Sequence, residues 1–194
     1  MNIYRLKVSL ADFKGIRRWF DMSGNCTFDD LHKMIFVAYD RYDQHLYKFY
    51  FPQEKTGSLE KIYMSPLIVQ HPFLHKDAVA DRSYDLPYAA RGLPKPKLLA
   101  TNKAVLDDAG LREKQEFFYL FDLGDEWWHK VHVEKIEHED IKGKSKKLIK
   151  RTGDSPPQYP NPEDEEEMPD GYELVIEKRG GIAIGSYISK KKQA

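Results

Sequence analysis

The most informative part of the sequence is residues 117–136, FFYLFDLGDEWWHKVHVEKI. Aromatic side chains crowd its first half, and aromatic residues favour the half-buried surface of a strand. The segment Asp122–Asp125 contains a glycine and two aspartates, which is the chemistry of a tight turn. From Trp127 to Glu134, apolar and polar residues alternate with period two. The stretch therefore predicts two antiparallel strands joined by a turn.

The returning strand has two chemically different faces. Alternation places Trp127 and His129 on the apolar face and turns Trp128 toward the polar face. A turn centred on Leu123–Gly124 places Phe118 opposite His129. We therefore expect Trp127 to belong to the core and Trp128 to face outward.

The first fifty residues predict a hairpin, a helix and a further strand. Residues 2–10 and 16–22 alternate as strands, and residues 42–51 form a third one. Thr27 is a suitable N-cap for a helix that ends at about Tyr39. This order predicts an α+β fold, with a mixed, mainly antiparallel sheet and a helix packed across it in a β-grasp-like core.

We expect a single domain over residues 1–194. Prolines and scattered aromatics at about 66–100 predict an irregular insertion. The basic and acidic runs at about 140–170 predict a flexible loop. Alternation favours two late strands within residues 172–188, joined by a Gly180–Gly181 turn.

Composition limits the possible functions. Lys and Arg number 31, and Asp and Glu also number 31, so no global charge favours nucleic acid or membrane. The single cysteine, Cys26, excludes an internal disulfide framework and suits a reducing cytoplasm. No apolar run approaches the length of a membrane span. The sequence thus predicts a cytoplasmic protein with no membrane partner.

Histidines and aspartates provide one set of candidate site residues. Imidazole and carboxylate groups can form a divalent metal site or an acid/base pair if the fold gathers them. Alternatively, Asp122 and Asp125 bond the turn backbone and His129 is a buried, hydrogen-bonded core residue. No pair has a recognised zinc spacing, so we expect no cofactor. The candidate metal ligands are His32, His45, Asp125 and His129.

A second set could bind a partner. An outward tryptophan can stack on a base or a peptide, or can simply pack at the edge of the sheet. Alternation sends the two neighbouring arginines to opposite faces, and the inward one needs a carboxylate, for which Asp122 or Asp125 is available. The candidate binding residues are Trp128, Lys130, His132, Arg17 and Arg18.

The densest basic run is residues 142–151. It could contact nucleic acid phosphates, or it could be a solvated, mobile loop. The acidic run Glu163–Glu167 lies close by in sequence and opposes phosphate binding. We therefore favour the loop.

Three stretches together resemble a known family. They are Thr27–His32, Asp43–Phe49 and Phe121–His129. In order and spacing they are similar to the plasmid pRiA4b ORF-three-like family, also described as passenger proteins of an insertion-sequence transposon. The resemblance covers about Ile3 to Tyr172, and its most specific motif is Asp-x-Gly-Asp-x-Trp-x-His, at residues 122–129.

The chain departs from the family pattern in two places. The family shows Ile-Trp-Arg-Arg after the first turn, whereas residues 16–19 are Ile-Arg-Arg-Trp. Near the end, Ser155–Pro157 and Pro162–Asp164 are similar to a cysteine-bearing family segment but contain no cysteine. A metal or redox role of that cysteine therefore does not carry over.

The resemblance implies an α+β domain and no established reaction. Recombinase chemistry needs a positioned nucleophile and a strongly basic DNA face, and neither is evident. Our first hypothesis is a non-enzymatic binding or interaction module, with a protein or nucleic acid partner and a link to mobile genetic elements. The alternative is a metal-dependent or acid/base enzyme centred on His129, Asp125 and His45.

Overall fold

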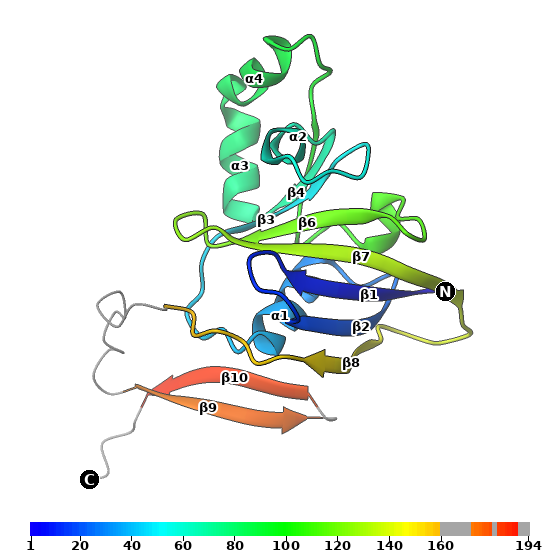
Figure 1. Cartoon of the computed structure of the whole chain (residues 1–194), viewed down its shortest axis with the longest axis vertical. Helices are drawn as coiled ribbons and strands as arrows, with labels where there is room; N and C mark the ends of the chain where they lie inside the picture. The colour runs from blue at the N-terminus through cyan, green and yellow to red at the C-terminus, as the bar shows by residue number, and fades with distance from the viewer. Residues whose placement is uncertain (160–171, 180–181, 190–194) are drawn as a thin grey trace.

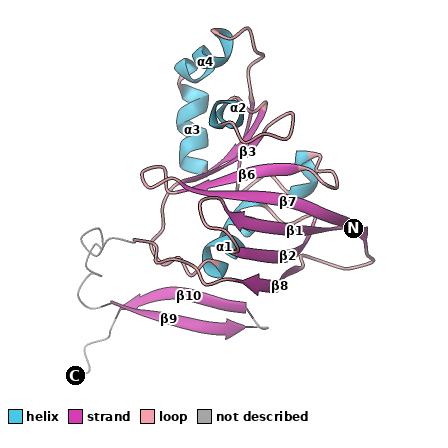
Figure 2. Cartoon of the chain, viewed as in Figure 1, coloured by secondary structure: helices cyan, strands magenta, loops and turns pink. Residues whose placement is uncertain are grey.

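The computed structural model describes residues 1–159, 172–179 and 182–189. Strands form the body of the molecule, and the short helices within residues 59–89 lie at one end (Figures 1 and 2). The strands are β1 (Asn2–Leu10), β2 (Arg17–Ser23), β3 (Tyr47–Phe51), β4 (Leu67–Gln70), β5 (Lys97–Ala100), β6 (Glu116–Phe121), β7 (Trp127–His138), β8 (Lys146–Thr152), β9 (Tyr172–Arg179) and β10 (Ile182–Ser189). The helices are α1 (Phe28–Ala38), α2 (Leu59–Tyr63), α3 (Pro72–Ala80) and α4 (Leu86–Ala89), with 3-10 turns η1 (Arg82–Asp85) and η2 (Leu106–Ala109).

Eight of these strands form one open sheet in the order β5-β4-β3-β6-β7-β1-β2-β8. Only β4 and β5 pair in parallel, and the other neighbours are antiparallel. Strands β9 and β10 pair separately. This mixed, mainly antiparallel sheet with a few helices confirms the predicted α+β class. Every helix in the described part of the chain is too short or too polar to cross a membrane.

Helix α1 packs across one face of the sheet, called here the inner face. Its start is fixed by a capping box, in which the Thr27 hydroxyl accepts from the Asp30 amide and the Asp30 carboxylate accepts from the Thr27 amide. Apolar residues at helical spacing then point at the sheet. The buried residues of the helix are Phe28, Leu31, His32, Met34, Ile35 and Ala38.

The opposite, outer face carries a second and smaller core. Helix α2 lies over it, and Ile62 packs there with side chains from β3, β4, β6 and β7. The buried members are Tyr50, Ile62, Ile68, Phe118, Leu120 and Trp128. The central strands are therefore covered on both faces, which explains why residues 42–51 are bulky on both sides.

A five-residue turn separates β6 from β7. Tyr119 faces His129, so the predicted pairing of Phe118 with His129 is wrong by one position. The cause is the backbone: Asp122 and Glu126 both have positive φ, 59° and 53°. Residues other than glycine rarely adopt this conformation, so the sequence suggests a shorter turn than the chain makes.

Two regions are more regular than expected. The insertion at about 66–100 contributes β4 and β5, which extend the sheet, as well as α3 and α4. The basic run is a loop only over residues 142–145, because residues 146–151 belong to β8, which pairs with β2 at the sheet edge. The acidic run Glu163–Glu167 and the Gly180–Gly181 turn lie outside the described residues.

Candidate functional site

Asp122 shapes the turn between β6 and β7. Its Oδ1 accepts hydrogen bonds from the amides of Gly124, at 2.9 Å, and Asp125, at 3.3 Å. A short polar side chain that bonds the local backbone stabilises the left-handed conformation. Asp122 therefore has the turn-bonding role considered for it from the sequence.

The other oxygen of Asp122 faces an imidazole. Nε2 of His45 lies 3.4 Å from Oδ2 of Asp122, 3.2 Å from Oδ2 of Asp43 and 2.9 Å from the hydroxyl of Tyr159. That hydroxyl donates to Asp43 at 2.6 Å. Burial and the bond to Asp43 raise the pKa of Tyr159, so its phenol stays protonated. These four side chains are called the turn cluster.

His32 is a core histidine. Its Nδ1 lies 2.7 Å from the hydroxyl of Tyr119, and its ring is stacked on Tyr47 with centroids 3.6 Å apart. Burial lowers the pKa of His32 to about 3, and it raises the pKa of Tyr119. Both side chains are therefore neutral at physiological pH and bonded to each other.

His129 is buried on the inner face of β7, next to the rings of Tyr39 and Tyr119. Its Nδ1 donates to the carbonyl of Trp127 at 2.9 Å, because a carbonyl can only accept. Burial and the charge of Arg41 lower the pKa of His129 to about 3. The ring is thus neutral with its proton on Nδ1.

The four candidate metal ligands lie in three different surroundings. His32 and His129 are in the inner core, His45 belongs to the turn cluster, and Asp125 lines a groove on the outer face. Within residues 1–159 and the two late strands, no three His, Cys, Asp or Glu side chains are arranged to hold a metal ion.

Sequence reasoning missed Arg41. This residue is 6% exposed, and its Cζ lies 3.9 Å from the ring centre of Trp127. Burial lowers the pKa of Arg41 to about 10, so the guanidinium stays charged. The sequence offers one clue: Arg41 is a cation between aromatic and acidic neighbours. The segment Tyr39–Asp43 has no periodicity that would show which side is buried.

The segment Gly153–Tyr159, called here the strap, holds the same region from the other side. Pro156 accepts a hydrogen bond from Nη1 of Arg41 at 3.0 Å. The side chain of Gln158, which is fully buried, accepts from the amides of Tyr42 and Asp43. The strap therefore ties the end of β8 to the loop before β3, and it contributes Tyr159 to the turn cluster.

The outer face has a groove of about 790 Å³ beside α2. Its floor includes Ile62, Phe118 and Trp128, and the β1–β2 loop forms one wall. Three of the five candidate binding residues line it together: Trp128, Lys130 and Arg17.

The other expectations for this face need correction. Trp128 is only 8% exposed, because the rings of Tyr50 and Tyr63 pack beside it, so it offers no open stacking surface. His132 is on the same face but does not line the groove, and its Nδ1 lies 3.8 Å from Glu116.

Arg18 points inward, as alternation predicts for one of the two arginines, but it does not pair with Asp122 or Asp125. It is 1% exposed and donates to four backbone carbonyls and to Oγ of Ser155. Carbonyl dipoles thus replace the expected carboxylate, and these bonds hold Arg18 to the end of α1, to β8 and to the strap.

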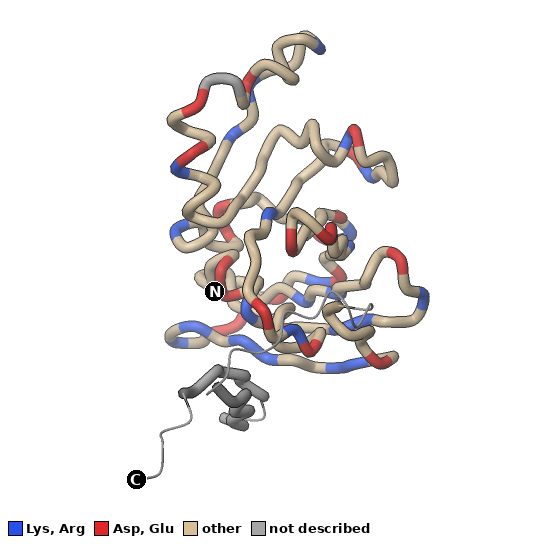
Figure 3. Tube along the Cα trace, turned by 90° about the vertical axis from the view of Figure 1, so that its left-hand side faces the viewer, with Lys and Arg blue, Asp and Glu red and all other residues tan. Residues whose placement is uncertain are grey.

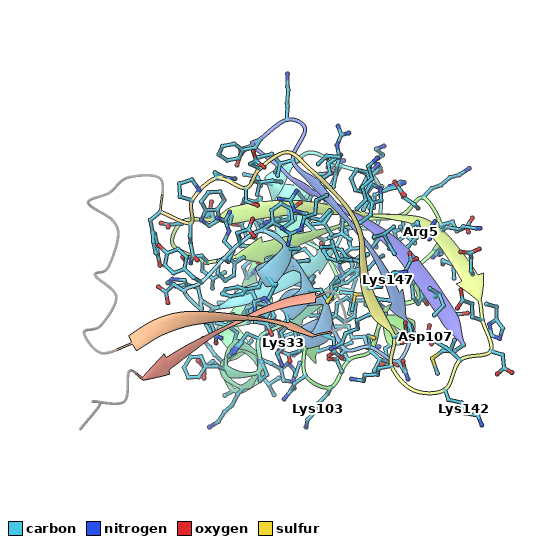
Figure 4. The ribbon with its side chains drawn as sticks, turned by 90° about the horizontal axis from the view of Figure 1, so that it is seen from below. Arg5, Lys33, Lys103, Asp107, Lys142 and Lys147 are labelled. Atoms are coloured by element: carbon cyan, nitrogen blue, oxygen red, sulfur yellow. The ribbon has the colours of Figure 1, made fainter. Side chains whose placement is uncertain are left out.

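The cations of β8 and of the loop before it are partly neutralised. Lys144 and Lys146 bind Asp30 at 2.7 and 2.8 Å. Burial would raise the pKa of Asp30, but these hydrogen bonds hold it well below its usual value. Acidic and basic residues are interspersed over the tube in Figure 3, while Lys142 in Figure 4 points away from the molecule. Two cations of the basic run are therefore already paired with a carboxylate.

These features define a class: an α+β protein with an eight-stranded sheet, a polar cluster at one hairpin and a groove on the outer face. The model of the family "Plasmid pRiA4b ORF-3-like protein" matches residues 2–177, and the chain belongs to this family. A crystal structure of a protein of unknown function, MM3350 from Methanosarcina mazei Go1, is similar, with 27% identity and a TM-score of 0.53. The match covers 81% of this chain and 73% of that one. No curated protein matches.

Proposed function

We propose that the chain is a non-enzymatic binding module that takes an extended segment of another protein in the outer groove. The observation that carries this proposal is the groove itself, where Trp128, Lys130 and Arg17 meet. A concave site with an apolar floor and a polar rim is the usual form of a recognition site.

The charges of the rim favour a polypeptide over a nucleic acid. Lys14, Arg17 and Lys130 are cationic, but Asp12 and Asp125 line the same groove. A phosphate backbone carries one sign of charge and would be repelled by these carboxylates, whereas a peptide can match both signs.

The floor and its margins suggest the chemistry of the partner. Leu59 and Phe13 line the groove and are 51% and 39% exposed, which extends the apolar surface beyond the floor. An aliphatic or aromatic side chain of the partner would pack there as the anchor, with an acidic neighbour directed at Arg17 or Lys130.

The enzyme alternative has less support, because His129, Asp125 and His45 lie in three different surroundings. The family name comes from a plasmid reading frame. Proteins encoded by mobile elements are therefore the first natural partners we would test.

Selection of random peptides on the purified full-length chain tests the proposal. We expect enriched peptides to share an apolar anchor with a nearby acidic residue. Selection repeated on Arg17→Glu should lose the acidic preference, and Lys142→Glu, on an exposed loop, should keep it. Failure to enrich any motif, or the same motifs on Arg17→Glu, would count against the groove.

A further inference from the structure

The guanidinium of Arg41 has an unused pair of donors. Its Nε and Nη2 are buried and have no hydrogen-bond partner among the described residues. In the same chain, Nε and Nη2 of Arg5 bind the two oxygens of Asp21 at 2.8 and 2.7 Å. This side-on fork has the geometry that matches a carboxylate or a phosphate.

The surroundings of Arg41 add another donor, and the Asp40 carboxylate that acts on its charge is exposed. The indole Nε1 of Trp127, whose ring lies against the guanidinium, is also buried and without a partner among the described residues. The neighbouring Asp40 has a 60% exposed side chain and lies 3.5 Å from Arg151. His129 is neutral. A buried cation is costly unless an anion pairs with it, so this set of donors suits an anionic ligand.

We propose that Arg41 and Trp127 form an oxyanion site beneath the strap. The fork of Arg41 takes two oxygens of a carboxylate or phosphate group, and the indole N–H of Trp127 donates to one of its oxygens. This site lies on the inner side of β7, where Trp127 packs with the inner core, although Phe13 of the outer groove stacks on the same ring.

Entry to the site requires movement of the protein, since the donor atoms are covered. The strap is the cover that can move: residues 153–159 form no helix or strand, and Pro156 bonds Nη1 of Arg41 directly. Gln158 holds the strap to the loop before β3. Weakening the bonds of Gln158 should therefore ease entry.

Two sources can supply this chemistry. One is a free small molecule with a carboxylate or phosphate group. The other is the chain itself, because the acidic run Glu163–Glu167 follows the strap in sequence. Arg41 and Trp127 would recognise both sources in the same way. An added anion should bind the wild type in the first case, whereas in the second case the chain's own acidic run would already occupy the site.

Calorimetric titration of the full chain with inorganic phosphate and with citrate, at constant ionic strength in chloride, tests the site. We expect a Kd of about 1 mM or tighter for one of them. Arg41→Lys, which keeps the charge and loses the fork, should weaken binding at least about tenfold. Arg5→Lys is the matched control, since its fork already holds Asp21. Gln158→Ala, which loosens the strap, should increase the rate at which the anion binds.

Two further variants make every outcome decisive. Trp127→Phe removes the indole donor while keeping an aromatic ring beside Arg41, and should weaken binding severalfold even if Arg41→Lys fails to fold. If the wild type binds neither anion, a variant with Glu163–Glu167 changed to the corresponding amides should bind, and Arg41→Lys in that background should abolish it. No binding by wild type and amide variant alike, or equal binding with and without the Arg41 fork, overturns the proposal.

Discussion

Trp127 and Trp128 are consecutive residues of β7, and their rings lie on opposite faces of the sheet. The ring of Trp127 lies against Arg41 and packs with the inner core, while the ring of Trp128 packs against Tyr63 of α2 on the outer face. One strand thus contributes to both proposed sites: its inward tryptophan to the oxyanion site, and its outward one to the floor of the groove. Disruption of β7 would affect both.

Arg18 and Arg17 form a natural pair for testing what burial does to an arginine. Arg18→Met leaves the carbonyl of Ala38, at the end of α1, and that of Gly153, in the strap, without this donor, and should lower the free energy of unfolding by about 3 kcal/mol. Arg17→Met, at an exposed position, should change it by less than about 0.5 kcal/mol. Urea denaturation measures both. Similar losses for the two variants would refute the structural role of Arg18.

Asp122 should be sensitive to loss of its side-chain oxygen. Asp122→Ala removes the acceptor for the amides of Gly124 and Asp125 and leaves an alanine at a positive φ, so we expect a loss of about 1–2 kcal/mol. Asp122→Asn keeps an acceptor and tolerates the backbone conformation, so it should lose less. Thermal unfolding compares them. An asparagine variant as unstable as the alanine variant would show that the carboxylate charge matters more than the turn.

Acidification should destabilise the fold through two buried histidines. His32 and His129 have native pKa values of about 3, below the value of about 6.5 for an unfolded histidine. Because the unfolded chain binds these protons first, the stabilisation is complete above about pH 6.5 and is lost as pH falls toward 3. At pH 5 the loss is up to about 2 kcal/mol for each histidine.

Urea unfolding at pH 7.5 and 5.0 measures this effect. His129→Gln should remove about one proton from the pH dependence. A free energy of unfolding that does not change between the two pH values would contradict the assignment of both rings as neutral core residues.

Local patterns predict much of this fold because they report which side of an element is buried. The Thr27 cap and the alternation in β1 and β7 are such patterns, and the structure has the helix and strands they predict. The register of the hairpin is different, because it depends on positive φ angles at Asp122 and Glu126 that their residue types do not require.

The candidate site was harder to predict because its contacts join distant segments. Arg41 meets Pro156, and His45 meets Tyr159, across more than a hundred residues of sequence. No periodicity links such positions. Trp128 lies on the face that alternation predicts, but its cover comes from α2, which is distant in the sequence.

The most direct test of the binding proposal is the Kd of one selected peptide, measured by fluorescence anisotropy, for wild type and three charge variants. The groove predicts that Arg17→Glu and Lys130→Glu each weaken binding at least about tenfold, while Lys142→Glu leaves the Kd unchanged. Equal Kd values for all four proteins would place the peptide elsewhere and contradict the account.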